Sequence, residues 1–335
     1  MKLASEDDIL RIVEQFFPSS HPSLLLGRGD DCAILRPGGP LAVTTDIFAE
    51  NTHFRQRYFT PYDIGFKAAA VNISDVGASG ARPTGLSIGL TLTGNEDDKW
   101  ISEFCQGMNS LCKEFSLALS GGDLSRSMQI NICITAWGEL PSSLPQGLRR
   151  GVAKEGDVIF LVGAIGLARL GFTLLEHATA KEEIASLKST WPKSCEKHLR
   201  PFPLAKEGMA IAQFAIHHNL QSRIGLMDVS DGLARDLPRL LASRRLNLGA
   251  DIALSEENLD DELLRYAEKN GISASSFAFE GGEDYALAGT CPEEAWPELV
   301  RKISVPSFIL GHVWKGSLML NGMKPQSPGF DHFSC

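Results

Sequence analysis

The feature that most constrains this chain is a recurring pattern: an apolar run ends in small or hydroxyl residues, and an acid follows. The pattern occurs in LAVTTD, AVNISD, LALSGGD, GLMDVSD and FEGGED, and LGRGDDCAIL has two acids directly before an apolar run. A buried carboxylate is stable only when it is paired or bound to a metal ion. A single acid of this kind is more often a turn residue or a helix N-cap. The repetition, with glycines beside the acids, instead indicates that acids gather where buried segments of an α/β core end, which is where ligands bind.

Such a set of acids predicts bound cations, because clustered carboxylates repel one another. Hard oxygen ligands suit Mg²⁺, which proteins usually hold with a few carboxylates and the phosphates of a substrate. Magnesium that bridges a polyphosphate is typical of phosphoryl transfer. We therefore expect metal ions, and not a lysine, to balance Asp228 and Asp231 in MDVSDGLARDL, where Met227 and Val229 are expected in the core.

Charge and cysteine usage narrow the function further. The chain has 41 acidic and 32 basic residues, a net charge of −9, which argues against a nucleic-acid binder with a basic face. No apolar run is long enough to cross a bilayer, and MKLASEDDILRIVEQFF is typical of an amphipathic helix capped by Ser5, not of a signal peptide. Seven cysteines without a CxxC pair indicate reduced thiols in the cytoplasm and no zinc site.

Strand-like and helix-like segments alternate, which predicts an α/β fold. We expect strands at 85–92, 129–138, 158–163 and 308–314, and helices at 62–72, 97–114, 204–218, 233–243, 257–269 and 293–303. The Pro-, Ser- and Gly-rich segment 139–147 is the expected boundary between two α/β domains, 1–138 and 148–335.

Several common nucleotide-site and catalytic motifs are absent. The chain has no GxxxxGK[ST] loop, no GxSxG elbow and no kinase HRD or DFG signature. LVGAIGLARLG at 161–171 has three glycines after a predicted strand but lacks the GxGxxG core, so close packing of strand and helix is the preferred interpretation.

The motifs together resemble the thiamine-monophosphate kinase family. They are GRGDDCAIL, TTD, HF at 53–54, KAAAVNISDVGASGARP, SGGD, RRGVAKEGD, HLRPFP, MDVSDGLARDL, FEGGEDYAL and GFDHF, in the family's order and spacing from about residue 25 to the end. The resemblance implies the aminoimidazole ribonucleotide synthetase-like fold. Its N-terminal α/β domain binds ATP and metal and forms a homodimer through its sheet, and its C-terminal α/β domain completes the site. The implied reaction transfers the γ-phosphoryl group of ATP to thiamine monophosphate with several Mg²⁺ ions. We expect no nucleic-acid or membrane partner, because of the net charge and the lack of a long apolar run.

The resemblance also implies roles for individual residues. The implied metal ligands are Asp31, Thr44, Thr45, Asp46, Asp75, Asp123, Asp228 and Asp231, with Asp30 beside them. Asp31, Asp75, Asp123 and Asp231 are the implied catalytic residues. The implied nucleotide contacts are Gly122, Asp123, Arg150 and Ser230, and the implied substrate contacts are His53, Glu283 and Phe330. Taken alone, His53 would be a structural histidine, Arg150 a surface charge, Phe330 a tail anchor, and Thr44 and Thr45 ordinary strand residues.

The chain departs from the family pattern at three places. Asn51 replaces a common glycine, and asparagine still tolerates a left-handed backbone. Leu124-Ser125 replaces a Thr-Thr pair, and Ala286 replaces an acid. None of these changes touches the carboxylate set.

Two other classes of function stay open. One is an ATP-dependent ligase of the same superfamily, such as aminoimidazole ribonucleotide synthetase; SDGL together with GGEDY favours the kinase. Selenophosphate synthetase is disfavoured further, because no Cys-Gly-Cys-Lys-like stretch precedes the first domain. The other class is a non-catalytic metal- or nucleotide-binding protein, which we would expect to lack part of the acid set.

Overall fold

The computed structural model describes residues 5–325, 327 and 329 of the 335-residue chain. The chain divides into two compact units, Met1–Val76 with Ala81–Pro145 and Gly77–Gly80 with Gln146–Cys335. Each unit combines a sheet with helices, so the predicted α/β class is confirmed. No helix of the described residues is long and apolar enough to span a membrane.

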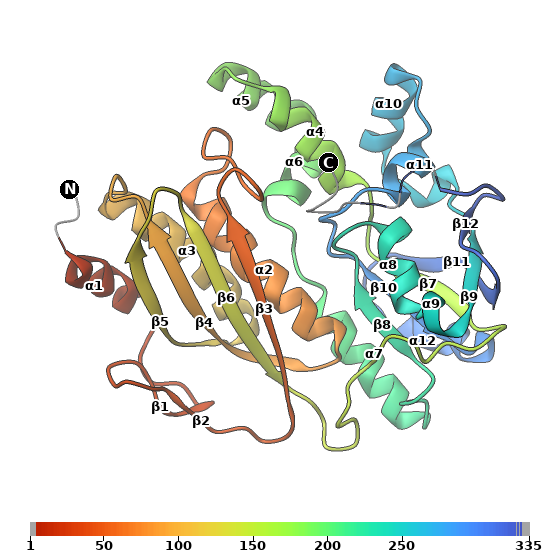
Figure 1. Ribbon diagram of the computed structural model, residues 1–335, viewed down its shortest axis with the longest axis horizontal. Coiled ribbons are helices and arrows are strands. Elements are labelled where there is room, and N and C mark those ends of the chain that lie inside the picture. The colour runs from red at the N-terminus through yellow and green to blue at the C-terminus, as the bar shows by residue number, and fades with distance from the viewer. Residues whose placement is uncertain (1–4, 326, 328, 330–335) are drawn as a thin grey trace. The chain divides into compact units, whose positions relative to one another are not determined.

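The first unit is built on a four-stranded sheet of order β3-β6-β4-β5. Its strands are β3 (Leu41–Ala49), β4 (Arg82–Leu92), β5 (Ala118–Arg126) and β6 (Asn131–Glu139), and a small hairpin, β1 (Leu24–Leu26) and β2 (Ile34–Leu35), stands apart. Its helices are α1 (Glu6–Phe16), α2 (Pro61–Ala78) and α3 (Asp98–Phe115). Figure 1 shows α2 and α3 on one face of the sheet. The predicted cap of α1 is confirmed, since the Ser5 side chain accepts a hydrogen bond from the Asp8 amide in a capping box.

The two faces of this sheet differ in burial. On β3, Phe48 faces the helices and is buried, whereas Val43 and Ile47 on the other face are each 63% exposed. Side chains alternate between faces along a strand. The helix-covered face is therefore the core of this unit, and the other face is open within the chain.

The second unit has a six-stranded sheet of order β12-β9-β11-β7-β10-β8. Its strands are β7 (Val158–Val162), β8 (Gly225–Asp228), β9 (Leu248–Ile252), β10 (Leu287–Cys291), β11 (Ser307–Lys315) and β12 (Met319–Leu320). Its α-helices are α4 (Leu167–His177), α5 (Lys181–Thr190), α6 (Pro192–Leu199), α7 (Ala205–His217), α8 (Leu233–Leu240), α9 (Ser243–Leu246), α10 (Asp261–Asn270), α11 (Ala274–Phe279) and α12 (Trp296–Leu299). Every residue of β7 and β10 is buried, which means that both faces of the sheet are covered at these strands, since successive side chains point to opposite faces.

Three predicted helices are shorter or more broken than expected. Residues 233–243 contain α8, which ends at Leu240, and the first residue of α9. Residues 257–269 begin with the 3₁₀ turn η1 (Glu256–Asn258) before α10 starts. Residues 293–303 form η2 (Glu293–Ala295), α12 and η3 (Val300–Lys302) in place of one helix. Short helical pieces of this kind share the 3.6-residue pattern of a continuous helix, so periodicity alone does not separate them.

Candidate active site

The first group of site residues lies on the helix-covered face of the first unit. Thr44 and Asp46 stand two residues apart on β3 and therefore point to the same side. The Thr44 hydroxyl donates a 2.6 Å hydrogen bond to the Asp75 carboxylate, which α2 carries near its end. Strand alternation and one helix thus bring Thr44, Asp46 and Asp75 together.

The electrostatics of this group suit a hard cation. Burial, together with the negative charge of Asp75, raises the pKa of Asp46 from 3.8 to about 6. A carboxylate that resists ionisation beside a second carboxylate gains most from a neighbouring divalent cation. The donors are all oxygen atoms, the chemistry that Mg²⁺ prefers. The residues present therefore fit a magnesium site, although no three His, Cys, Asp or Glu side chains form a metal-sized cluster within the described residues.

Thr45 and Asp123 lie on the other face of the same sheet. Thr45 points away from Thr44, and its hydroxyl is 2.8 Å from that of Thr135 on β6. Residues that are paired across neighbouring strands point to the same face of a sheet. Asp123 on β5 is connected in this way, through Gly89 on β4 and Cys133 on β6, to Ile47 on β3, so Asp123 also lies on the open face. The predicted ligands of this unit thus divide between two faces of one sheet.

Four further predicted residues lie in loops or in a tight strand pairing. Asp30 and Asp31 are exposed, and the Asp31 amide donates a 2.8 Å hydrogen bond to the Asp30 side chain. Gly122 lies so close to β4 that an added Cβ would be 1.8 Å from the Ile88 carbonyl oxygen, so only glycine fits there. Arg150 belongs to the second unit and is exposed just before Gly151.

The loop that carries His53 follows β3 directly. The His53 Nδ1 atom accepts a 3.1 Å hydrogen bond from the Ala49 amide, and the ring stacks on Phe48 with centroids 5.7 Å apart. An Nδ1 atom that accepts a hydrogen bond leaves the proton of the neutral ring on Nε2. Asn51 has a φ of 63°, so the prediction that asparagine keeps the left-handed backbone here is confirmed.

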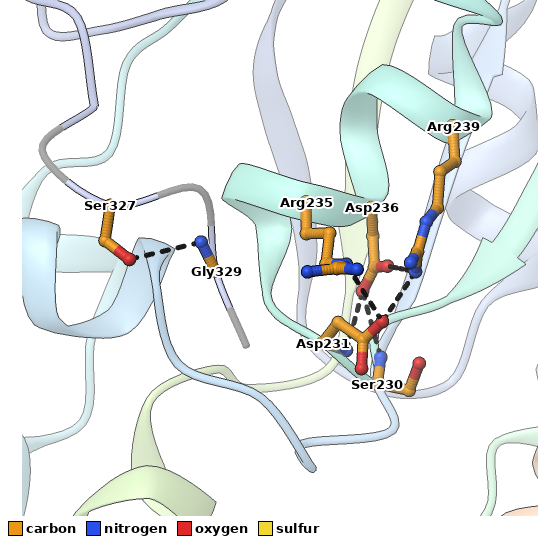
Figure 2. A network of polar contacts seen from close by, with 7 residues as sticks. All are labelled: Ser230, Asp231, Arg235, Asp236, Arg239, Ser327 and Gly329. Atoms are coloured by element: carbon orange, nitrogen blue, oxygen red, sulfur yellow. Dashed lines mark hydrogen bonds and ion pairs between the residues drawn. The ribbon is translucent and has the colours of Figure 1, made fainter. Parts of the chain in front are cut away.

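The second unit presents Asp228, Ser230 and Asp231 where β8 leads into α8. Asp228 ends β8 and is buried, whereas Ser230 and Asp231 are partly exposed. The amides of Ser230 and Asp231 donate hydrogen bonds of 3.1 and 2.9 Å to the buried Asp236 carboxylate, as Figure 2 shows. Burial is the main cause that raises the pKa of Asp236 to about 6. Asp236 therefore fixes the backbone that carries Asp231.

Asp231 also has basic partners, which the sequence reasoning missed. Arg239 Nη1 is 2.6 Å from Asp231 Oδ2 and 2.9 Å from Asp236 Oδ1, and Arg235 Nε is 3.6 Å from Asp231 Oδ2 (Figure 2). These arginines follow Asp231 by four and eight residues, so the spacing of one helical face could have indicated them. The expectation of metal alone as the counter-charge of Asp231 is therefore incomplete.

Glu283 and Asp284 lie in a loop next to β10. The buried Asp284 carboxylate accepts hydrogen bonds from the Gly166 and Ala168 amides, 2.7 and 3.0 Å long, at the start of α4. Glu283 is partly exposed, and its Oε2 atom is 3.3 Å from Nδ1 of the buried His198 on α6. The neighbouring departure, Ala286, is fully buried.

The C-terminal segment reaches this same loop and α8. The Ser327 amide donates a 3.1 Å hydrogen bond to the Glu280 carboxylate. A Cβ on Gly329 would lie 2.8 Å from both the Asp231 carbonyl oxygen and the Arg235 Cβ, so the chain passes very close to α8. Phe330, the third predicted substrate contact, lies outside the described residues.

Comparison with known proteins gives consistent matches along the whole chain. Residues 29–140 match the family model "AIR synthase related protein, N-terminal domain". The thiamine-monophosphate kinase of Haemophilus influenzae is 34% identical over 330 residues, which cover 93% of this chain and 92% of that protein.

Solved structures of thiamine-monophosphate kinases are also similar to this chain along its whole length. The crystal structure of thiamine-monophosphate kinase from Stenotrophomonas maltophilia superposes with a TM-score of 0.79 at 28% identity, covering 96% of this chain and 98% of that one. A structure of AaThiL complexed with AMPPCP and TMP gives a TM-score of 0.70 at 27% identity and covers 99% of both chains. These matches confirm the predicted aminoimidazole ribonucleotide synthetase-like fold.

Proposed function

Because the chain belongs to the thiamine-monophosphate kinase family, we propose that it transfers the γ-phosphoryl group of ATP to thiamine monophosphate, giving thiamine diphosphate and ADP. The observation that carries this proposal is 34% identity to a thiamine-monophosphate kinase over 93% of the chain. AaThiL, which shares the fold, binds AMPPCP, an ATP analogue, together with TMP.

We assign Mg²⁺ to the oxygen donors of the site. Thr44, Asp46 and Asp75 would hold an ion on the helix-covered face of the first unit's sheet. Thr45 and Asp123 would hold another on the open face, and the exposed Asp31 and Asp30 would add further carboxylates. Asp228 and Asp231 would hold an ion in the second unit. Bound Mg²⁺ supplies neutralisation of the phosphate charges. The raised pKa of Asp46 beside Asp75 supports this assignment, because the pair is destabilised as two bare charges.

The chain's own residues orient the two substrates. Gly122 and Ser230 would offer backbone and hydroxyl groups to the nucleotide, and Arg150 an exposed guanidinium suited to phosphate oxygens. His53, Glu283 and Phe330 would contact the thiamine part, whose cationic ring suits a carboxylate and an aromatic face. Asp236 holds the loop that presents Asp231.

No side-chain general base is required. The attacking group is a phosphate oxygen whose second pKa is near ~6, so it is mostly deprotonated at neutral pH. The main difficulty is to bring two polyanions together in line, which needs neutralised charge and alignment. The geometry of His53 is consistent with this mechanism, because its Nδ1 accepts a hydrogen bond from the Ala49 amide, which leaves the proton of the neutral ring on Nε2.

We further propose that the protein forms a homodimer through the open face of the first unit's sheet. We also propose that it is located in the cytoplasm. Val43 and Ile47 leave two large apolar side chains exposed on that face. The six described cysteines are free thiols, which supports a reducing compartment. In this assignment domain 1–138 binds ATP and metal and forms the dimer, and domain 148–335 completes the site.

The proposed function is tested by incubation of the purified chain with ATP, Mg²⁺ and thiamine monophosphate, with the products separated by chromatography. Thiamine diphosphate and ADP should appear together, and neither should form with excess chelator. A ligase of the same fold would leave thiamine monophosphate unchanged.

A further inference from the structure

The loop that carries Glu283 is held rigidly by its backbone. Glu283 and Tyr285 have φ values of 64° and 48°, a left-handed conformation that costs free energy in residues with a Cβ. The Glu283 amide donates to the Ser230 carbonyl at 2.7 Å, and the Tyr285 amide donates to the Val229 carbonyl at 2.9 Å. Between them, Asp284 is anchored on the start of α4. The backbone position of Glu283 is therefore set, and the orientation of its side chain depends on its neighbours.

Helix α6 supplies a partner for that side chain. His198 is 1% exposed, and its Nδ1 atom is 3.3 Å from Glu283 Oε2. Phe172 of α4 contacts the His198 ring edge-on with centroids 5.6 Å apart. Gly171 lets α4 and α6 approach closely, since a Cβ there would lie 2.8 Å from the His198 Cβ. The imidazole is thus fixed by packing, while the Glu283 side chain is still 30% exposed and can reach a ligand.

Helix α6 also carries a partner of the neighbouring acid, Asp284. Lys197, the residue before His198, interacts electrostatically with Asp284, which opposes the effect of burial on the pKa of both groups. Two consecutive residues of α6 therefore face two consecutive acids of the loop. The amides of Lys193 and Ser194 at the start of α6 in turn donate to the buried Glu262 carboxylate, at 3.1 and 2.9 Å. Helix α6 is itself a fixed support.

We propose that His198 is a positioning residue, which holds the Glu283 carboxylate in the orientation that receives the cationic ring of thiamine monophosphate. This inference rests on the proposed function, in which Glu283 contacts the substrate. A glutamate side chain has several freely rotating bonds, and ordering it on binding would weaken affinity. The buried imidazole orders it before the substrate arrives, as a supporting group does in a preorganised site.

The first experiment compares two variants of His198 in substrate binding. Affinities for thiamine monophosphate are measured by calorimetry with Mg²⁺ and AMPPCP present, and affinities for AMPPCP are measured separately. His198→Leu should weaken thiamine monophosphate binding about tenfold, because the Glu283 side chain is then ordered only when the ligand binds. His198→Asn, whose amide nitrogen can occupy the place of Nδ1, should stay near the wild type. AMPPCP binding should change in neither variant.

A double-mutant cycle tests whether His198 acts through Glu283. Glu283→Gln should weaken thiamine monophosphate binding, and adding His198→Leu to it should have little further effect. His218→Leu is the matched control, since His218 lies 3.8 Å from the exposed Glu298 and should leave both affinities unchanged. Thermal melts of each variant report any loss of fold.

The results separate this inference from the proposed function. Equal weakening of both ligands, additive effects in the cycle, or unchanged thiamine monophosphate binding in folded His198→Leu would overturn the positioning role. Turnover of the wild type is measured independently. If the wild type binds thiamine monophosphate but does not phosphorylate it, the proposed kinase function is wrong, and the binding experiment still tests the positioning role of His198. A wild type that binds no thiamine monophosphate rejects both.

Discussion

At the scale of single residues, the hydrogen bond from the Ala49 amide to His53 Nδ1 decides what this histidine can do. A ring whose Nδ1 accepts has Nε2 as a donor and no second lone pair to take a proton. We expect His53→Asn to raise the KM for thiamine monophosphate about tenfold, through loss of one polar contact to a charged group. Turnover at saturating substrate should remain measurable, as steady-state kinetics will determine. Complete loss of turnover with intact substrate and metal binding would mean that His53 acts as a base.

The buried carboxylate of Asp284 should make the free energy of unfolding depend on pH. Burial is the main cause that raises its pKa from 3.8 to about 6, against the opposing effects of Lys197 and the Ala168 and Gly166 amides. Because the folded state binds this proton more tightly than the unfolded chain, the contribution of Asp284 to stability falls as pH rises from about 4 to about 6. Above about pH 6 the contribution of Asp284 to stability stays at its lower level.

The matched variant is Asp284→Asn, which cannot titrate. The free energy of unfolding of the wild type minus that of the variant should be larger at about pH 4 than at about pH 7. Urea denaturation at both pH values measures the difference. A difference that is equal at both, or larger at about pH 7, would show that the folded state does not hold this proton.

Sequence patterns indicated the candidate acids of the site, but not the residues that support them. Thr44, Asp46 and Asp75 lie in motifs, and the structure brings them together. His198 and Glu283 are far apart in the sequence, and only the packing of α6 makes them neighbours, so no local spacing indicates the pair. Thr44 and Thr45 lie on opposite faces of the sheet because side chains alternate along a strand. The strands predicted from the sequence do not include residues 41–49, so the sequence did not indicate this division.

At the scale of elements, α2 and α3 cross through a reciprocal pair of glycines. A Cβ on Gly65 would lie 2.0 Å from the Phe104 carbonyl oxygen, and one on Gly107 would lie 2.0 Å from the Tyr62 carbonyl oxygen. This close approach fixes the helix that carries Asp75 against its neighbour.

We expect Gly107→Ala to lower the free energy of unfolding by about 2–3 kcal/mol, because backbone atoms must move apart to admit the methyl group. Gly38→Ala is the control: its nearest neighbour would be Glu139 Oε2 at 3.5 Å, an ordinary contact. Chemical denaturation of both variants provides the comparison. Equal stability of the two would show that the helices do not cross this closely.

The predicted strands agree with the structure more fully than the predicted helices. Residues 85–92 lie within β4, and β7 covers residues 158–162 of the predicted 158–163. Runs rich in apolar residues at strand spacing indicated both strands. Residues 293–303 instead break into turns and one short helix around Pro297. Proline is tolerated in the first turn of a helix, so a single proline does not show where the pieces join.

At the scale of the whole molecule, the open face of the first unit's sheet predicts how copies of the chain associate. Val43 and Ile47 are each 63% exposed there, which favours burial against a second copy. We expect the wild type to sediment as a dimer at micromolar concentration and Ile47→Lys to sediment as a folded monomer, since the lysine would bury an unpaired charge. A monomeric wild type, or a variant that remains dimeric, would contradict this interface.

Phosphorus NMR of the chain with ATP, Mg²⁺ and thiamine monophosphate follows the fate of the γ-phosphorus of ATP and so measures the proposed transfer itself. We expect this phosphorus to appear as the terminal phosphate of thiamine diphosphate, one for each ADP formed, without release of inorganic phosphate. Asp75→Asn, which removes one charge of the carboxylate pair, should slow this transfer by orders of magnitude. Release of the γ-phosphorus as inorganic phosphate, with thiamine monophosphate left unchanged, would show that the protein is not a thiamine-monophosphate kinase.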